Sequence, residues 1–234
     1  MRSFFKRFSI TGSHSKEKEK KEEAQKEEKV VRKYDAPVFR KEVEEKSMSL
    51  SADFDDDEYF FGACFRGEVA SLKNYLSNQT NEDVKKSRIR SKDSFGRTAL
   101  HFACDAGVFE IVKLLVTNGA YAYDVDSEGY TPVHRAARNG SVEIIEFLLN
   151  SQEKSDLERV LNQTTKETRR TPLHIATLEC HHGVAKVLLK HGAKRNIQDM
   201  FGNAPKHYGL RYDGDDVRFG GDSEDKKFRN GLCC

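Results

Sequence analysis

Three stretches of the chain carry apolar residues at helical spacing. Hydrophobic side chains recur three to four positions apart at Ile111, Val112 and Leu115, at Ile144, Ile145 and Leu148, and at Val184 and Leu188. Each set falls on one face of a helix. Small residues come before each set, at Ala103, Ala136, Ala137 and Ala176. The pattern therefore predicts pairs of helices, with small residues where neighbouring first helices meet.

The predicted helix pairs repeat along the chain. The strings TALHFACDAGVFEIVKLLVTNGA, TPVHRAARNGSVEIIEFLL and TPLHIATLECHHGVAKVLLKHGA begin at Thr98, Thr131 and Thr171. The first interval is 33 residues, and the second is 40, which leaves seven residues inserted between 150 and 168. Because one such pair cannot bury its own apolar face, the repeats are expected to stack.

The ends of each first helix are marked by residues suited to those positions. The threonine that opens each string can cap the helix, and Pro132 and Pro172 stand at the first helical position, where a missing N–H costs nothing. Gly107 and Gly140 are placed to end the first helix and turn the chain.

The strings resemble the ankyrin-repeat family in their T-P-L-H start, mid-repeat glycine and final Gly-Ala. The resemblance covers about residues 53–210 and implies an all-α solenoid, in which each repeat is a β-turn, two antiparallel helices and a loop. We expect four repeats and a degenerate half repeat, near 53–92, 93–125, 126–165, 166–198 and 199–210.

The terminal units depart from the repeat pattern. The first lacks T-P-L-H and has Phe60, Phe61, Ala63 and Cys64 in its first helix, which suits an N-terminal cap. The last keeps Asp199, Gly202, Pro205 and His207, and we expect it to fray into the tail.

The fourth unit has substitutions at both of its turns. Cys180 replaces the glycine between the helices, and Lys166 and Arg169 stand where other units have the Asp and Gly of the β-turn. A residue other than glycine with positive φ costs roughly 1 kcal/mol or more. We therefore predict that this is the least stable interior repeat.

The rest of the chain is charged and lacks periodicity. Charged residues make up 33% of the sequence, and the segment 16–29 alone holds six Lys and six Glu. We interpret 1–52 as an arm that is disordered or a solvated helix, and 211–234 as a flexible tail. The net charge of +2 gives no reason to expect a nucleic-acid partner.

The cysteines and histidines do not predict catalysis. Five cysteines are too few for a secreted disulfide framework, which favours a cytoplasmic protein, with the nucleus left open. Cys180, His181, His182 and His191 lack the spacing of a zinc site. No nucleophile or phosphate-loop motif is present, so we expect no enzyme activity, metal or cofactor.

Three further histidines, His101, His134 and His174, recur at one repeat position. We interpret each as an imidazole that bonds the turn of its own or the next repeat, rather than as part of a proton relay.

In proteins of this family, the partner is usually held by the β-turn tips and the first-helix face. The corresponding positions here are Phe95, Arg97, Asp105, Glu128, Tyr130, Arg138, Asn139, Thr168, Arg170, Leu178, Glu179, Met200, Phe201 and Asn203. Arg97, Tyr130 and Arg170 form a stripe one repeat apart, and Tyr and Arg are enriched in binding hot spots. The alternative is that they are the scattered charges and aromatics of any such surface.

Both ends of the chain suggest modification. Cys233 and Cys234 resemble a lipidated pair, with two unmodified thiols as the alternative, and Arg2, Lys6 and Arg7 lie among phenylalanines at the other end. Ser9 resembles a basophilic kinase site, and Asn196 resembles the loop asparagine that is hydroxylated in ankyrin repeats.

The sequence thus predicts a monomeric, non-enzymatic adaptor that captures a protein partner, either free or tethered to a membrane surface through its termini. The alternative is a soluble regulatory subunit or inhibitor that masks an enzyme or a transcription factor.

Overall fold

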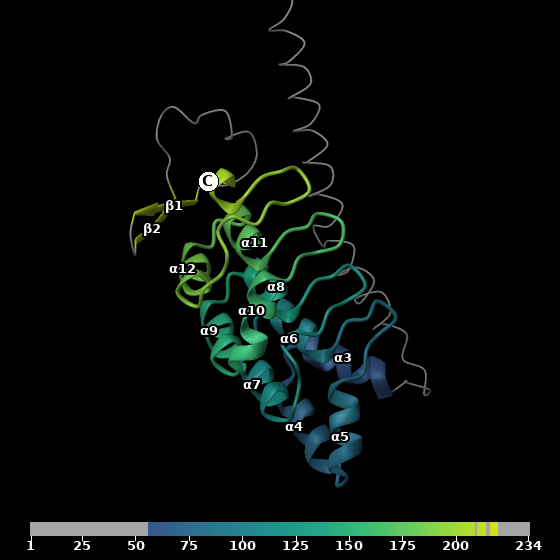
Figure 1. Cartoon of the computed structure of the whole chain (residues 1–234). Helices are drawn as coiled ribbons and strands as arrows, with labels where there is room; N and C mark the ends of the chain where they lie inside the picture. Colours follow the sequence, from purple (N-terminus) through teal and green to yellow (C-terminus); the bar gives the residue numbers. More distant parts are fainter. Residues whose placement is uncertain (1–55, 209, 214–215, 220–234) are drawn as a thin grey trace, which may run out of the picture. The chain divides into compact units, whose positions relative to one another are not determined.

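The computed structural model describes residues 56–208, 210–213 and 216–219, and these form a mainly helical domain (Figure 1). Its helices are α3 (Asp56–Arg66), α4 (Val69–Asn78), α5 (Glu82–Ile89), α6 (Ala99–Ala106), α7 (Phe109–Thr117), α8 (Pro132–Asn139), α9 (Val142–Asn150), α10 (Lys154–Asn162), α11 (Pro172–Leu178) and α12 (His182–Lys190). A 3₁₀ helix, η1 (Pro205–Tyr208), and the strands β1 (Leu210–Asp213) and β2 (Asp216–Phe219) follow.

Four helix pairs stack one on another. The first helices of the pairs are α3, α6, α8 and α11, and each packs against the next; α4, α7, α9 and α12 form a second layer in the same order. Long loops join one pair to the next and project to one side in Figure 1. The predicted all-α solenoid is confirmed.

The core is a thin apolar seam between the two layers. Second-helix residues such as Ile111, Leu115 and Ile145 have no exposed surface. The small residues of the first helices, Ala103, Ala136, Ala137 and Ala176, are also fully buried. Alanine has no side chain beyond Cβ, so successive first helices can approach closely along their whole length.

The predicted helix ends are confirmed. Thr98, Thr131 and Thr171 each form a capping box with the histidine three residues later. Gly107 and Gly140 end α6 and α8 with φ of 72° and 79°, in the left-handed region that glycine adopts without strain.

The seven inserted residues belong to a helix that the apolar pattern did not predict. This helix is α10, and α5 stands in the corresponding place after the first pair. The C-terminal end of α5 binds the loop after α7, where Arg90 Nε donates to Gly119 O at 2.9 Å. The C-terminal end of α10 binds the loop after α12, where Lys194 N donates to Asn162 Oδ1 at 2.8 Å. Each extra helix thus supports the repeat that follows it.

The final unit continues beyond the point where we expected it to fray. After η1, strands β1 and β2 pair antiparallel, with Leu210 opposite Phe219 and Asp213 opposite Asp216. These strands lie within the segment interpreted as fraying end and tail, so that expectation is corrected for these eight residues. Four residues of alternation are too few for a strand prediction.

The β-turn of the fourth unit is one residue longer than the others. Thr165 N donates to Arg170 O across it, whereas Asp126 N donates to Tyr130 O in the preceding turn. Thr165, not Lys166, therefore takes the place of the turn aspartate, and its hydroxyl accepts from Arg170 N at 3.0 Å. Arg169 has φ of 53°, and Cys180 has φ of 56°.

Arg169→Gly should raise the free energy of unfolding by about 1 kcal/mol, because the exposed Arg169 side chain is replaced by a residue that tolerates positive φ. The measurement is equilibrium urea unfolding of the two proteins. Arg169→Ala is the control, because it removes the same side chain and keeps the strained φ. An equal gain in both variants would contradict the strain explanation.

Candidate partner-binding surface

The β-turns between repeats, which we call fingers, are built around one carboxylate each, except the finger at 165–170, where the Thr165 hydroxyl takes that place. Oδ1 of Asp126 accepts from Glu128 N at 3.0 Å and from Tyr130 N at 2.8 Å. Asp93 and Asp199 hold their own fingers in the same way. One side chain therefore fixes the backbone of each of these fingers.

A single backbone hydrogen bond joins each finger to the next. Ser127 N donates to Phe95 O at 2.8 Å, Lys166 N donates to Glu128 O at 2.8 Å, and Met200 N donates to Thr168 O at 3.0 Å. The fingers therefore form a continuous strip, and their tips lie at set positions along the domain.

The three recurring histidines tie the first helices to this strip. In each, Nδ1 accepts from the backbone N–H of the capping threonine, so the neutral imidazole carries its proton on Nε2. Nε2 then donates to a carbonyl of the next finger: His101 to Tyr130 O at 3.1 Å, His134 to Arg170 O at 3.2 Å and His174 to Asn203 O at 3.2 Å. The predicted turn-bonding role is confirmed.

Burial keeps these imidazoles neutral. Desolvation lowers the pKa of His101 to about 4 and that of His134 to about 3, and it lowers the pKa of His174 as well. A proton on Nδ1 would prevent the ring from accepting the hydrogen bond of the threonine N–H. It would also place a positive charge at a buried site, where desolvation disfavours charge.

The free energy of unfolding should fall as the pH drops from about 6.5 towards 5, because the unfolded histidines bind protons that the folded ones exclude. Each buried histidine contributes a slope of about 1 kcal/mol per pH unit once the pH is below its unfolded pKa. The measurement is urea unfolding at several pH values within this window. His134→Gln should give a shallower slope, and a flat profile in the parent protein would rule the linkage out.

Two arginines, Arg97 of the predicted stripe and Arg135 of the next repeat, bind the finger carboxylates Asp93 and Asp126. Arg97 Nη2 lies 2.6 Å from Asp93 Oδ2, and its guanidinium lies over Phe95 and Phe102. In the next repeat, the Arg135 guanidinium lies over the half-buried Tyr130 ring, with Cζ 4.6 Å from the ring centre. These contacts hold the fingers against the helices.

Three residues of the predicted surface, Thr168, Arg170 and Leu178, are buried. Arg170 is 7% exposed; its Nε lies 3.7 Å from Asp199 Oδ2, and its guanidinium packs against Phe201 and Tyr208. Leu178 is 9% exposed. The expectation that Arg170 offers its side chain to a partner is therefore corrected, because the next finger and η1 cover it.

Arg170→Ala should lower the free energy of unfolding by about 2 kcal/mol or more, since it leaves the buried Asp199 carboxylate without its cation and opens space beside Tyr208. The measurement is chemical unfolding. Arg169→Ala again serves as control, because Arg169 is the adjacent arginine and is exposed. Equal stability of the two variants would show that Arg170 has no structural role.

The first-helix residues of the predicted surface join neighbouring repeats but stay partly accessible. Arg138 Nη2 donates to Asp105 Oδ1, and each side chain is 20% exposed. Asn139 is exposed, and its Nδ2 donates to Asp105 O at 2.7 Å. A partner can reach these groups at the surface, where they are already held in place.

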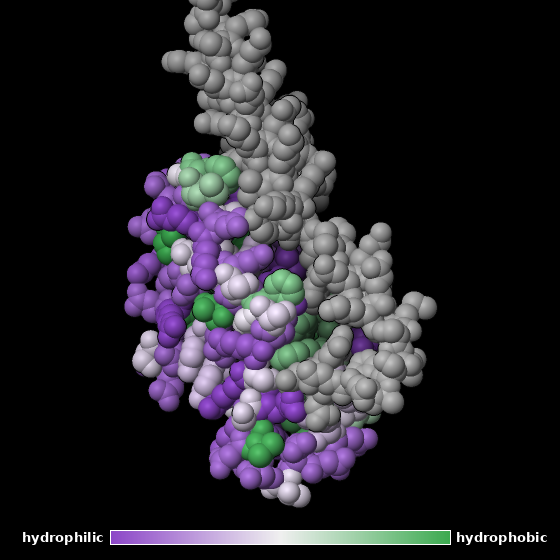
Figure 2. All heavy atoms as spheres, turned by 90° about the vertical axis from the view of Figure 1, so that its right-hand side faces the viewer, coloured by the Kyte–Doolittle hydropathy of each residue, from purple (hydrophilic) through white to green (hydrophobic). Residues whose placement is uncertain are grey.

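The exposed side chains of the fingers are apolar at both ends of the strip and charged between. Phe95 is 52% exposed and Met200 is 49% exposed. Glu128 lies between them and is also exposed, whereas Phe201 is half-buried. Figure 2 shows this side of the molecule as a largely hydrophilic face with separate hydrophobic patches.

The extra residue in the finger at 165–170 changes which of its side chains face solvent. Thr168 is buried, like Arg170, whereas Lys166, Glu167 and Arg169 are exposed. Sequence alignment of the repeats missed these three because it placed the turn one residue too late. Their exposed charges extend the candidate surface between Glu128 and Met200.

The structure brings no metal site together in the described ranges: no group of three His, Cys, Asp or Glu residues is arranged to hold an ion there. His181 Nε2 bonds Arg138 O, and His191 bonds Val187 O. Cys64 and Cys104 are buried, and burial raises the pKa of the Cys64 thiol to about 12.

The predicted modification sites are for the most part not tested by the structure. Ser9, Cys233 and Cys234 lie outside the described residues. Asn196 is exposed in the loop after α12, and its hydroxylation stays a prediction. Within the described residues, no helix is long and apolar enough to cross a membrane.

Comparison with protein families agrees with this geometry. The pattern described as "Ankyrin repeats (3 copies)" matches residues 60–160, and that described as "Ankyrin repeat" matches residues 168–200. The chain belongs to the ankyrin-repeat family. An ankyrin-repeat domain is a non-catalytic module that binds other proteins.

Relatives of this chain contain ankyrin repeats but carry different protein names. The chain is 29% identical over 148 residues to the probable 26S proteasome regulatory subunit p28 of Saccharomyces cerevisiae, which covers 62% of this chain and 60% of that protein. It is 29% identical to mouse inversin over 53% of this chain and 11% of inversin. It is 37% identical to human ankyrin repeat and SOCS box protein 16 over 35% of this chain and 17% of that protein.

Proposed function

We propose that this ankyrin-repeat protein is a non-enzymatic adaptor that holds a protein partner along the strip of fingers and the adjoining first-helix face. The observation that supports this most strongly is the strip itself. Backbone hydrogen bonds set its tips at fixed spacing, and Phe95 and Met200 stand exposed at its two ends.

This arrangement suits protein recognition for two physical reasons. The fingers and the Asp105–Arg138 pair are ordered before binding, so little conformational entropy is lost when a partner docks. The two apolar residues supply area to bury, while Glu128, Lys166 and Arg169 between them supply charge that selects the partner.

The names of the relatives indicate which partner to test first. Proteins named for the proteasome, for inversin and for a SOCS box are similar to this chain at 29%, 29% and 37% identity, so similarity at this level reports the module that they share. Among the three relatives named above, the yeast protein with the proteasome name aligns with this chain over the greatest length, and the 26S proteasome is therefore the first candidate.

Phe95→Ala combined with Met200→Ala should weaken capture of the partner about tenfold or more, because it removes the two exposed apolar anchors of the strip. Binding of purified 26S proteasome to immobilised full-length protein is the first measurement. Stability should change little, since both side chains are half exposed.

The control is Val142→Ala, which also removes an exposed apolar side chain. Val142 is 38% exposed and lies on α9, away from the fingers. If the double variant and this control bind equally, the strip is not the surface that holds this partner.

The second candidate function is that of a regulatory subunit or inhibitor. It is supported by the name of the yeast relative, which is a probable regulatory subunit. Its surface would be the same strip. An adaptor leaves the activity of its partner unchanged and joins it to a third protein, whereas an inhibitor lowers that activity. Peptidase activity of the proteasome, measured with and without the chain, separates the two.

A further inference from the structure

Helices α5 and α10 are connected by a stack of four side chains, which we call the Arg–Tyr stack. Arg90 Cζ lies 4.1 Å from the centre of the Tyr121 ring, and Arg159 Cζ lies 5.4 Å from that of Tyr123. Between them, the Tyr121 and Tyr123 rings stack with centroids 4.9 Å apart and an interplanar angle of 15°. The stack thus runs from α5, through the loop after α7, to α10.

The stack is accessible and separate from the fingers. Both arginines are exposed and both tyrosines are half-buried, and none of the four belongs to a finger or a first helix. Tyr and Arg dominate binding hot spots, and rings held by stacking lose little freedom when they are covered. The stack therefore has the composition and the order of a binding anchor.

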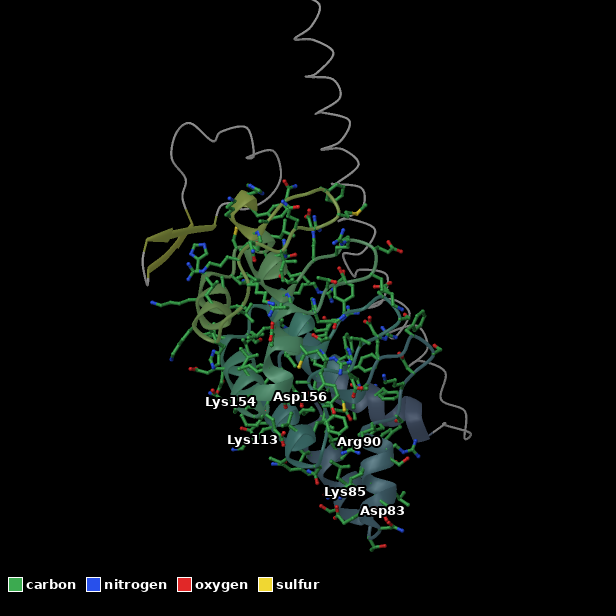
Figure 3. All side chains as sticks on the ribbon, viewed as in Figure 1. Asp83, Lys85, Arg90, Lys113, Lys154 and Asp156 are labelled. Atoms are coloured by element: carbon green, nitrogen blue, oxygen red, sulfur yellow. The ribbon has the colours of Figure 1, made fainter. Side chains whose placement is uncertain are left out.

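The surroundings of the stack are basic. Residues 82–90, 118–124, 154–162 and 190–196 hold nine basic and five acidic side chains. Lys113 on α7 and Lys154 on α10 are exposed and form no ion pair with a described residue. Figure 3 shows both along the same lower edge of the domain as Arg90.

Apolar surface is available at this edge as well. Val84 on α5 is 50% exposed, one of the most exposed large hydrophobic residues in the described part of the chain. It lies in the same short helix as Lys85, which Figure 3 places near Arg90. The edge thus offers cations, aromatic rings and an aliphatic side chain within a few helical turns.

We propose that this edge is a second interaction surface, whose ligand is an acidic peptide segment with interspersed apolar residues, supplied by a partner protein. Carboxylates of the segment pair with Arg90, Arg159, Lys113 and Lys154, and its apolar side chains cover the tyrosines and Val84. Arginine is suited to this role because its planar fork binds carboxylates through two hydrogen bonds while one face stays on a ring.

The acidic residues at the edge favour a peptide over a nucleic acid. Figure 3 places Asp83 and Asp156 among the cations of this surface, and Asp124 adjoins the stack in sequence. A phosphate backbone carries a charge at every nucleotide and would meet these carboxylates wherever it ran. A peptide can place uncharged residues opposite them.

The test uses the full-length chain and a fluorescein-labelled peptide of repeated Glu-Glu-Leu triplets, with binding followed by fluorescence anisotropy. Arg90→Gln combined with Arg159→Gln should weaken binding about tenfold, because both cations of the stack are lost. Lys113→Gln combined with Lys154→Gln should weaken it a fewfold without touching any packed side chain, and it keeps the test valid if the arginine variant is less stable.

The control is Lys73→Gln combined with Lys186→Gln, which removes two exposed lysines from α4 and α12 and should leave binding unchanged within twofold. Phe95→Ala with Met200→Ala should also leave it unchanged, so this surface is tested independently of the fingers. Equal binding by all variants, absence of peptide binding, or tighter binding of an oligothymidine strand than of the peptide would overturn the proposal.

Discussion

Each first helix of this protein is tied to the next finger by one neutral imidazole, and the order of the finger strip depends on that link. His134 closes the cap of α8 through Nδ1 and reaches the carbonyl of Arg170 through Nε2. The same two bonds recur at His101 and His174. A single side chain thus satisfies the start of a helix and sets the distance to the next repeat, and it can do both only while it carries one proton.

This link matters because the solenoid has no deep core. Apolar contacts are confined to a seam between two layers of helices, so each repeat is stabilised mainly by its neighbours. Alanines let the first helices approach, and the imidazole, the Asp105–Arg138 pair and one finger-to-finger hydrogen bond then fix the stacking. Helices α5 and α10 add support on the loops that follow the second helices, where Arg90 and Asn162 hold the backbone of the next repeat.

Charged side chains serve two purposes in this molecule. Arg97, Arg135 and Arg170 lie against ring faces and finger carboxylates, so they belong to the fold more than to the exposed surface. Lys113, Lys154 and Arg159 are exposed, and in the described residues no carboxylate is ion-paired with them. The proposed surfaces therefore rely on side chains that stay exposed: Phe95 and Met200 on the finger strip, and Lys113, Lys154 and Arg159 at the edge beside the tyrosine rings.

The sequence by itself determined the repeats, their helix pairs, the threonine caps, the glycine ends and the role of the histidines. These features are local, because a cap or a helical face is specified by residues within one or two turns. The tertiary structure decided which tip residues are exposed. Arg170 and Arg169 are neighbours in sequence, yet one is covered by the next finger and the other faces solvent. It also decided that Tyr121 and Tyr123 connect α5 with α10. This contact depends on how separate repeats pack against one another, and the spacing of residues along the chain does not specify that packing.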